Sequence, residues 1–296
     1  MSKGPIVLVV GATGKYARLV VPELRNRGAV VRALVRAESR AQIARENGAD
    51  QISIGDLRDP VSLERALPGV TGVFHIGPVF AADEARMGVN LVQAAERAGV
   101  KKFVFSSVIQ PTNTELKHHV AKVPVESALY NSRLQYTILQ PVNFMQNIGM
   151  AWPAIVSKRA FAEPFPADVR IARVDYRDVA EVAAIALTEE RLAFATLQLS
   201  AGMYDRRQIA AMISDELGEL IEARELSFNE WVAVARPPYG IQELQALATV
   251  YAHYSRYGLG GNSVSLSAAL QREPRSLRAY IRECANATAA QRARDA

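Results

Sequence analysis

The sequence of 296 residues has one cysteine, Cys284, and four histidines. A single cysteine excludes an intrachain disulfide and a thiolate cluster for zinc or iron–sulfur ligation, so a reducing compartment such as the cytoplasm fits the chain best. Two histidines, His118 and His119, are adjacent, but none of the four has an HExxH or other ligand spacing with carboxylates. We therefore expect no metal site.

Long hydrophobic runs are also missing, and none approaches the length needed to span a bilayer. The short apolar stretch before Gly11 has no small-residue cleavage site, which predicts a buried first strand and no signal peptide. The net charge is +5, but acidic and basic residues are interspersed and form no clustered basic run. We expect neither a membrane nor a nucleic acid as a partner.

Hydrophobic residues make up 49% of the chain and charged residues 22%, which is the balance of a protein with a sizeable core. From Pro5 onward, β-branched apolar runs of strand length alternate with amphipathic runs of helix length. This alternation is typical of right-handed βαβ units around a parallel sheet that is covered on both faces. We expect strands over residues 6–10, 30–35, 51–54, 70–76, 102–106 and 136–139, and helices over residues 15–27, 37–47, 60–67, 83–98 and 115–131.

The pattern loosens after Pro141. Three prolines, Pro153, Pro164 and Pro166, are expected to break the chain before it recovers in a helix over residues 176–190 and a strand over 196–199. The remainder is predicted to be mostly helical, with helices over residues 207–217, 241–257 and 276–284.

A glycine turn, Gly11-Ala12-Thr13-Gly14, lies between the first expected strand and the first expected helix. In such turns the first glycine permits the tight bend, the second lets the backbone approach a pyrophosphate, and a small third residue lets helix and strand pack closely. Here Gly11, Gly14 and Ala17 take these places. The phosphates would lie at the helix N-terminus, where N–H groups and the helix dipole favour negative charge. The turn predicts dinucleotide binding, and a structural turn without a ligand is the alternative.

The residue after the second expected strand distinguishes the two nicotinamide dinucleotides. An acidic residue there hydrogen-bonds the ribose 2′-hydroxyl of NAD, whereas arginine accommodates a 2′-phosphate. The sequence has Arg36 at this place, and Lys15 in the glycine turn adds a second positive charge. The pattern favours NADP(H), and a solvated arginine at a strand end is the alternative.

Several segments together resemble the atypical short-chain dehydrogenase/reductase group. That group includes NmrA-like regulators, NADPH quinone oxidoreductases, triphenylmethane and azo-dye reductases, and relatives of isoflavone reductase. The matching segments cover roughly the first half of the chain: the GATG turn, residues 31–36 (VRALVR), 55–59 (GDLRD), 103–107 (FVFSS) and 136–147 (YTILQPVNFMQN).

The resemblance implies an α/β fold: a Rossmann doubly wound parallel sheet with a smaller, mostly helical C-terminal substrate lobe. We expect an NADP(H)-binding domain over residues 1–150. A substrate-side lobe would follow over residues 151–296, with elements near residues 168–200 returning to the Rossmann core.

The resemblance also implies cofactor contacts. Asp56 and Leu57 would lie beside the adenine, residues 76–78 would run along the cofactor after the fourth strand, and residues 141–144 would approach the nicotinamide. For Asp56 the alternative is a helix cap or turn residue, and for Phe144 it is ordinary core packing. The full set of expected cofactor residues is Gly11, Thr13, Gly14, Lys15, Tyr16, Ala17, Arg36, Asp56, Leu57, Ile76, Gly77, Pro78, Lys122, Pro141, Asn143 and Phe144.

The expected catalytic residues depart from the ordinary short-chain enzymes, which use a Tyr-x-x-x-Lys pair and a serine. In this sequence Lys122 takes the lysine place and His118 takes the tyrosine place. In the enzyme interpretation, Lys122 holds the ribose, and an electron-poor acceptor is protonated by water or by His118, whose ordinary pKa is near 6.5. In the alternative, the pocket senses NADP(H) without turnover. For His118 and His119, two exposed residues at a helix start are an equally good interpretation.

Aromatic side chains suggest a flat, apolar acceptor such as a quinone, an azo compound or a conjugated carbonyl. The expected substrate residues are Phe80, Phe144 and Trp152, with Trp231 or Tyr239 from the helical lobe. Core packing of the lobe accounts for the same residues equally well. The sequence leaves open a homodimer and a regulated protein partner.

Overall fold

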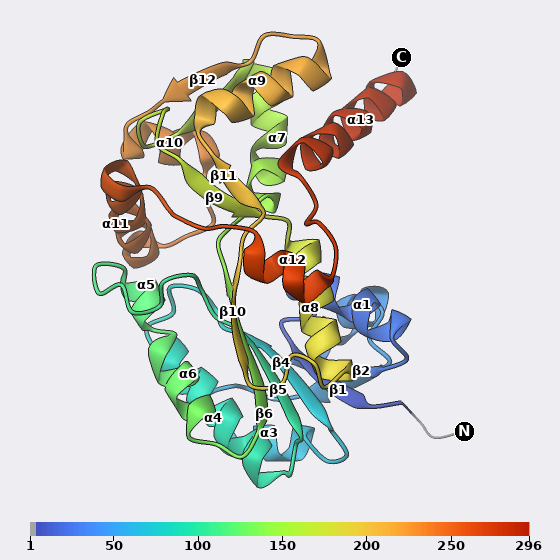
Figure 1. The fold of residues 1–296 in the computed structure, drawn as a ribbon. Helices are drawn as coiled ribbons and strands as arrows, with labels where there is room; N and C mark the ends of the chain where they lie inside the picture. Colours follow the sequence, from blue (N-terminus) through green and yellow to red (C-terminus); the bar gives the residue numbers. More distant parts are fainter. Residues whose placement is uncertain (1–3, 296) are drawn as a thin grey trace. The chain divides into compact units, whose positions relative to one another are not determined.

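The computed structural model describes residues 4–295 and falls into two compact units (Figure 1). The first unit takes in the chain up to Pro141 and returns for Tyr176–Gln198. The second contains Val142–Asp175 and the chain from Leu199 onward. Each unit is therefore built from two separate stretches of sequence.

A seven-stranded sheet forms the centre of the first unit within the described residues, in the order β10-β6-β5-β4-β1-β2-β3. The pairs from β6 to β3 are all parallel. The chain order reverses between β1 and β4, which makes this position the switch point of a doubly wound sheet. The predicted α/β Rossmann fold is confirmed. The strands are β1 (Ile6–Val10), β2 (Val30–Val35), β3 (Gln51–Ile54), β4 (Gly72–Ile76), β5 (Lys102–Ser106), β6 (Gln135–Pro141) and β10 (Ala195–Leu199).

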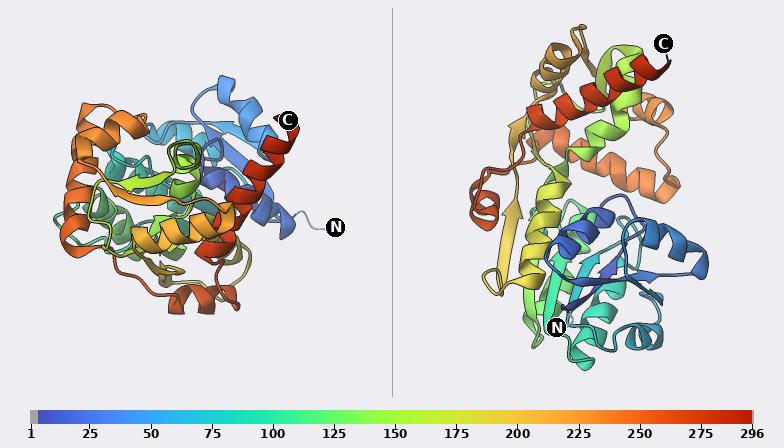
Figure 2. Two further views of the ribbon diagram at one scale, coloured as in Figure 1. Left: turned by 90° about the horizontal axis from the view of Figure 1, so that it is seen from above. Right: turned by 90° about the vertical axis from the view of Figure 1, so that its right-hand side faces the viewer.

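Helices cover both faces of this sheet, as the continuous apolar strands require. Helices α3, α4 and α6 lie on one face, and α1 packs with α8 on the other (Figures 1 and 2). The helices of the first unit are η1 (Ala17–Leu19), α1 (Val20–Asn26), η2 (Glu38–Arg40), α2 (Ala41–Glu46), α3 (Pro60–Ala66), α4 (Glu84–Arg97), α5 (Lys117–Val120), α6 (Val123–Tyr130) and α8 (Tyr176–Thr188).

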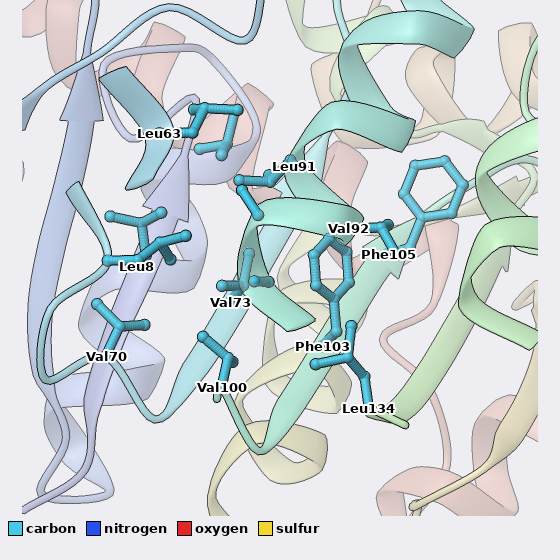
Figure 3. Packing of buried hydrophobic residues seen from close by; sticks show 14 of the residues in the cluster. Leu8, Leu63, Val70, Val73, Leu91, Val92, Val100, Phe103, Phe105 and Leu134 are labelled. Atoms are coloured by element: carbon cyan, nitrogen blue, oxygen red, sulfur yellow. The ribbon is translucent and has the colours of Figure 1, made fainter. Parts of the chain in front are cut away.

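The main core of the first unit lies between the sheet and helices α3, α4 and α6. Leu8, Val73 and Phe103 of the strands meet Leu63 of α3 and Leu91 of α4, and all five are fully buried (Figure 3). Each such side chain contributes about 1.5–3 kcal/mol by leaving water. This core holds the strand ends that carry the candidate site in fixed positions.

The first helix begins later than the sequence predicted. The chain stays in a turn through Tyr16, continues as η1, and becomes α-helical only at Val20. Pro22 is the physical reason, because it has no N–H to donate and is tolerated only in the first turn of an α-helix.

The single helix predicted over residues 115–131 is wrong, because two short helices, α5 and α6, occupy this segment. Pro124 lies in the first turn of α6 and has no N–H for the carbonyl of Val120. A new helix therefore begins at Val123, and Lys122 becomes its N-cap residue.

The second unit was predicted to be mostly helical, but it also contains several strands. Helix α7 also runs through Pro153, where a break was expected. A proline inside a helix costs about 3 kcal/mol, and burial of Ile148, Trp152 and Ile155 on one face of α7 offsets that cost. The elements are β7 (Asn143–Phe144), α7 (Gln146–Lys158), β8 (Ala160–Glu163), β9 (Ile171–Val174), β11 (Gly202–Tyr204), α9 (Arg206–Leu217), β12 (Glu222–Glu225), α10 (Phe228–Ala235), α11 (Ile241–Tyr257), α12 (Val264–Leu270) and α13 (Leu277–Asp295).

Helices α4 and α6 pack closely at Gly88. A Cβ atom on Gly88 would lie 2.4 Å from Cγ2 of Val125 and 3.2 Å from Nε2 of His75. Alanine would gain about 1 kcal/mol in helix propensity, but the clash in a packed core outweighs this gain. We predict that Gly88→Ala lowers the free energy of unfolding by about 1–3 kcal/mol, measured by urea denaturation.

The matched control is Gly260→Ala, because a Cβ on Gly260 would meet no heavy atom within 4 Å and its φ is not positive. Its free energy of unfolding should stay within about 0.5 kcal/mol of the wild type. An equal or smaller loss for Gly88→Ala would contradict the close packing.

Candidate functional site

The glycine turn lies at the switch point of the sheet, directly after β1. Gly11 has a φ of +81°, and a Cβ on it would lie 3.3 Å from both Ala17 Cβ and Ile76 Cγ2. The positive φ is a left-handed conformation that favours glycine, and the two neighbours leave little room for a side chain. The structure thus brings Gly11, Ala17 and Ile76 together, although they come from a turn, a helix and the end of β4.

Gly14 closes the turn by donating its backbone N–H to the carbonyl of Gly11 at 2.7 Å. A Cβ on Gly14 would lie only 3.0 Å from that carbonyl oxygen. Gly14 and Lys15 are exposed, and Thr13 and Tyr16 are half-buried. The ring of Tyr16 packs on the buried ring of Tyr176, with 5.1 Å between the centroids. The turn is held from inside the protein and presents its outer surface to solvent.

Basic residues lie in the glycine turn and in the segment that follows β2. Arg36 directly follows β2 and is exposed, like Lys15. Arg40 of η2 donates from Nη2 to Oγ1 of Thr13 at 3.4 Å, so it reaches back onto the turn. Arg40 was not among the predicted residues, although its place four positions after Arg36 was visible in the sequence.

Asp56 is a turn residue, which was one of the two structural roles considered for it. Its Oδ1 accepts from the N–H of Arg58 at 2.9 Å. The helix-cap alternative is wrong, because Asp59 caps α3 by accepting from the N–H of Val61. The carbonyl of Leu57 accepts from Asn90 of α4 at 2.9 Å. Asp56 and Leu57 are therefore fixed in the loop that follows β3, at the same edge of the sheet as the glycine turn.

Gly77 and Pro78 follow β4 at that same edge. Pro78 is exposed and Gly77 is half-buried. A Cβ on Gly77 would lie 2.5 Å from Oε1 of Glu84, the first residue of α4. A carboxyl group therefore lies directly against the backbone where the cofactor was expected to run.

Lys122 pairs with this carboxyl group. Its Nζ donates to Oε1 of Glu84, and the two residues are 6% and 3% exposed. Burial raises the pKa of Glu84, and the positive charge of Lys122 opposes the rise. His75 of β4 is 1% exposed, and burial together with Lys122 lowers its pKa to about 3. A buried cluster of three titratable groups thus lies beside Gly77.

A second buried polar cluster lies one helical turn further along α6. Oε1 of Glu126 accepts from the hydroxyl of Ser107 at 2.5 Å and from Nε2 of Gln140 at 3.0 Å. Ser107 follows β5 and Gln140 lies in β6, next to the buried Pro141. The carbonyl of Pro141 accepts from the N–H of Ile109 at 3.0 Å. These contacts fix the ends of β5 and β6 relative to Lys122.

His118 does not have the ordinary pKa that the enzyme interpretation assumed. Burial, with His119 and Lys122 nearby, lowers its pKa to about 3. Its ring lies 5.2 Å from that of Phe80, a residue with a φ of +66°. The interpretation of two exposed histidines is wrong as well, because His119 is buried and its Nδ1 lies 3.2 Å from the carbonyl oxygen of Gln110. The imidazole of His118 is therefore neutral at neutral pH.

The other candidate residues belong to the second unit. Oδ1 of Asn143 accepts from Arg173 at 2.8 Å and from Asn147 at 3.0 Å. Phe144 is half-buried in β7. Trp152 is 7% exposed in the core of this unit and donates its indole N–H to Thr288 at 2.8 Å. These are the surroundings of a core residue and favour the core-packing alternative for Trp152.

The second unit also holds a group of aromatic rings around Tyr251. Trp231 lies 5.1 Å from Tyr251 between ring centroids, and Phe165 and Phe228 lie 5.9 and 6.2 Å from it. Phe228, Trp231 and Tyr251 are only half-buried. Tyr239, the other lobe aromatic expected in the pocket, is 37% exposed.

Over the described residues, no group of three or more His, Cys, Asp or Glu side chains is placed to hold a metal ion. The helices of that same part of the chain include none that is both long and apolar enough to cross a membrane.

Comparison with known proteins gives matches over most of the chain. The model of the NmrA-like family matches residues 3–281. An NAD(P)H azoreductase from Xenophilus azovorans is 35% identical over 187 residues, which are 62% of this chain and 64% of the azoreductase. The match thus spans less than two thirds of that relative.

Two further matches extend over nearly the whole chain. Quinone oxidoreductase 2 of Escherichia coli (strain K12) is 25% identical over 268 residues, which are 88% of this chain and 92% of that protein. The structure of Citrobacter sp. triphenylmethane reductase complexed with NADP(H) aligns with a TM-score of 0.82 at 21% identity. It covers 94% of this chain and 99% of that one, which shows a shared fold.

The buried His75 makes stability depend on pH. In the unfolded chain its pKa is near 6.5, and in the folded protein it is about 3. The unfolded state therefore binds a proton first, so stability is fully present above pH 6.5 and is lost as the pH falls toward 3. One such group contributes a slope of about 1.4 kcal/mol per pH unit within this window.

We predict that His75→Asn reduces the slope of the unfolding free energy between pH 6.2 and 5.0 by roughly that amount. Urea denaturation at a series of pH values measures it, with His253→Asn, a half-buried histidine of α11, as the control. Identical slopes for the wild type and His75→Asn would contradict the lowered pKa.

Proposed function

Because the chain belongs to the NmrA-like family, we propose that it is an NADPH-dependent oxidoreductase. It transfers hydride to a flat, apolar acceptor such as a quinone, an azo compound or a conjugated carbonyl. The observation that carries this proposal is the basic group of Lys15, Arg36 and Arg40 around the glycine turn.

The residues at the switch point fit a dinucleotide. Gly11 and Gly14 make a turn that a Cβ atom at either position would disturb. The turn lies at the carboxyl end of β1, where open α/β sheets bind their ligands. Asp56 and Leu57 after β3 and Gly77 after β4 lie at the same edge and would hold the adenine and the length of the cofactor. The similar Citrobacter reductase structure is a complex with NADP(H), which supports this assignment.

The phosphorylated cofactor is favoured by charge. Arg36 takes the place of the acid that would bind a 2′-hydroxyl. Its planar guanidinium suits a phosphate, and Arg40 and Lys15 add positive charge on the same side of the turn. A phosphate that contacts these groups makes charge-assisted hydrogen bonds, each worth about 1.5–3 kcal/mol.

Lys122 supports the nicotinamide end. The cofactor, when bound, supplies the hydride, and the protein supplies its position. Lys122 has three N–H donors and gives one to Glu84, so it keeps donors for ribose hydroxyls. Asn143 and Phe144 remain proposed contacts on the nicotinamide side.

The acceptor would take its proton from water. His118 is neutral at neutral pH, so it is a poor acid and would act by hydrogen bonding beside Phe80. An electron-poor acceptor is compatible with this, because it takes hydride readily and places little demand on a protein acid. The half-buried ring of Phe80, next to His118, offers an apolar face for a flat molecule. Two relatives, an azoreductase and a quinone oxidoreductase, support this class of acceptor.

A second candidate function is an NADP(H) sensor without turnover. Two observations favour it: the tyrosine of ordinary short-chain enzymes is replaced by His118, and the pKa of His118 is lowered to about 3. In this case cofactor binding is unchanged, and only the reaction with acceptors is absent.

The cofactor preference is tested by charge reversal. We predict that Arg36→Asp with Arg40→Asp weakens NADPH binding by tenfold or more, at about 1.4 kcal/mol per factor of ten. NADH binding should change by less than about threefold, because NADH lacks the 2′-phosphate. Titration calorimetry at fixed salt measures both affinities.

The control is Arg45→Asp, which reverses one charge, half of the change in the double variant, at an exposed position of α2. It reports the long-range effect of net charge, which salt screens. Equal losses for NADPH and NADH in the double variant, or a wild type that prefers NADH, would refute the assignment.

The reaction is tested by NADPH oxidation against a panel of quinones, azo dyes and enones. We predict turnover with at least one of these classes. NADPH deuterated at the transferred position of C4 should reduce the rate, since hydride transfer breaks that bond. Tight NADPH binding without turnover on any acceptor would favour the sensor and overturn the enzyme.

A further inference from the structure

We infer that Glu84 is a positioning residue: its buried carboxylate holds Lys122 against the backbone at Gly77, and through Lys122 it fixes the nicotinamide-ribose end of the cofactor. This inference rests on the proposed function, because it assigns a role to Lys122 in cofactor binding. Glu84 itself need not touch the cofactor.

The position of Glu84 follows from the packing of α4 against α6. Glu84 and Gly88 are one turn apart on α4 and lie on the same face of that helix. Because Gly88 has no side chain, α6 approaches α4 so closely that a Cβ on residue 88 would clash with Val125. The carboxylate of Glu84 therefore meets Lys122 at the start of α6.

The carboxylate has contacts on two sides. On one side Oε1 accepts from Nζ of Lys122. On the other side the same oxygen lies 2.5 Å from the place of a Cβ on Gly77, so a side chain at residue 77 would displace this carboxylate. Glu84 thus links the ammonium group to the strand end along which the cofactor is proposed to run.

Burial makes the loss of either partner of this contact costly. Both side chains are nearly inaccessible, and Oε2 of Glu84 has no hydrogen-bond partner among residues 4–295. In such surroundings an ammonium group without its counterion is costly, so Lys122 stays with Glu84. A lysine has a flexible four-carbon stem, and the pairing selects one of its many conformers. The remaining N–H donors of Lys122 then have a defined direction.

A purely structural role predicts a different pattern of effects. If Glu84 only stabilised the fold, its loss would weaken all cofactor fragments alike. If it positions Lys122, only ligands that contain the nicotinamide ribose should be affected. Adenosine 2′,5′-bisphosphate lacks that ribose and retains the 2′-phosphate, so it separates the two cases.

The experiment is a double-mutant cycle on the full chain with Glu84→Gln, Lys122→Met and the double variant. Calorimetric affinities for NADPH and for adenosine 2′,5′-bisphosphate are measured for each. Glu84→Asp keeps the charge on a shorter side chain and covers the case in which Glu84→Gln fails to fold. Glu64→Gln is the matched control, because it breaks the exposed ion pair between Glu64 and Arg97 of α4.

We expect Glu84→Gln and Lys122→Met each to weaken NADPH binding about tenfold, with no further loss in the double variant. Glu84→Asp should lose less, about threefold, and Glu64→Gln should match the wild type. Binding of adenosine 2′,5′-bisphosphate should stay within about twofold throughout, which also shows that the variants are folded.

The inference is overturned if Glu84→Gln binds NADPH like the wild type, if it weakens both ligands equally, or if the two single effects add fully. A wild type that binds neither NADPH nor the bisphosphate overturns the proposed function and the inference together. A wild type that binds both, with an unaffected Glu84→Gln, overturns the inference alone.

Discussion

Helices α4 and α6 come close to each other only because residue 88 has no side chain. This one contact decides where several buried polar groups lie. It brings Glu84 to Lys122, and it places Nε2 of His75 beside the backbone of α4. One turn later along α6, Glu126 holds Ser107 and Gln140 at the ends of β5 and β6. A tight helix pair on one face of the sheet therefore organises charge at the carboxyl ends of three neighbouring strands.

The glycine turn imposes the second constraint at the same edge of the sheet. Gly11 fits between Ala17 and Ile76, so the strand end of β4 and the start of the first helix are fixed together. Because β1 and β4 are neighbours at the switch point, the turn and Gly77 lie side by side without any long-range loop. The basic side chains lie on the β2 side of the switch point, and the Glu84–Lys122 pair lies on the β4 side. This division of charge corresponds to the two ends of the proposed cofactor.

Most of the first unit was predictable from the sequence, because its strands are continuous apolar runs and its turns carry glycines. The predicted and observed bounds of β1, β2, β3 and β5 agree. The predicted helix bounds were wrong where a proline lies near the start of a helix, at Pro22 and Pro124. The missing N–H of each proline moves the first α-helical turn. Lys122 could be found from its spacing to His118. Its partner Glu84 could not, because the pair is joined by packing at Gly88 and not by sequence separation. The pKa of His118 was missed for the same reason, since burial is a property of the fold.

The first unit is proposed to bind NADPH through the turn after β1 and the basic group beside it, with Lys122 at the other end. Amide hydrogen exchange with and without cofactor tests it most directly. We expect NADPH to protect residues 11–16, 36–40 and 76–80, and NADH to protect residues 36–40 much less. Absence of protection at the glycine turn, or equal protection of residues 36–40 by NADPH and NADH, would contradict it.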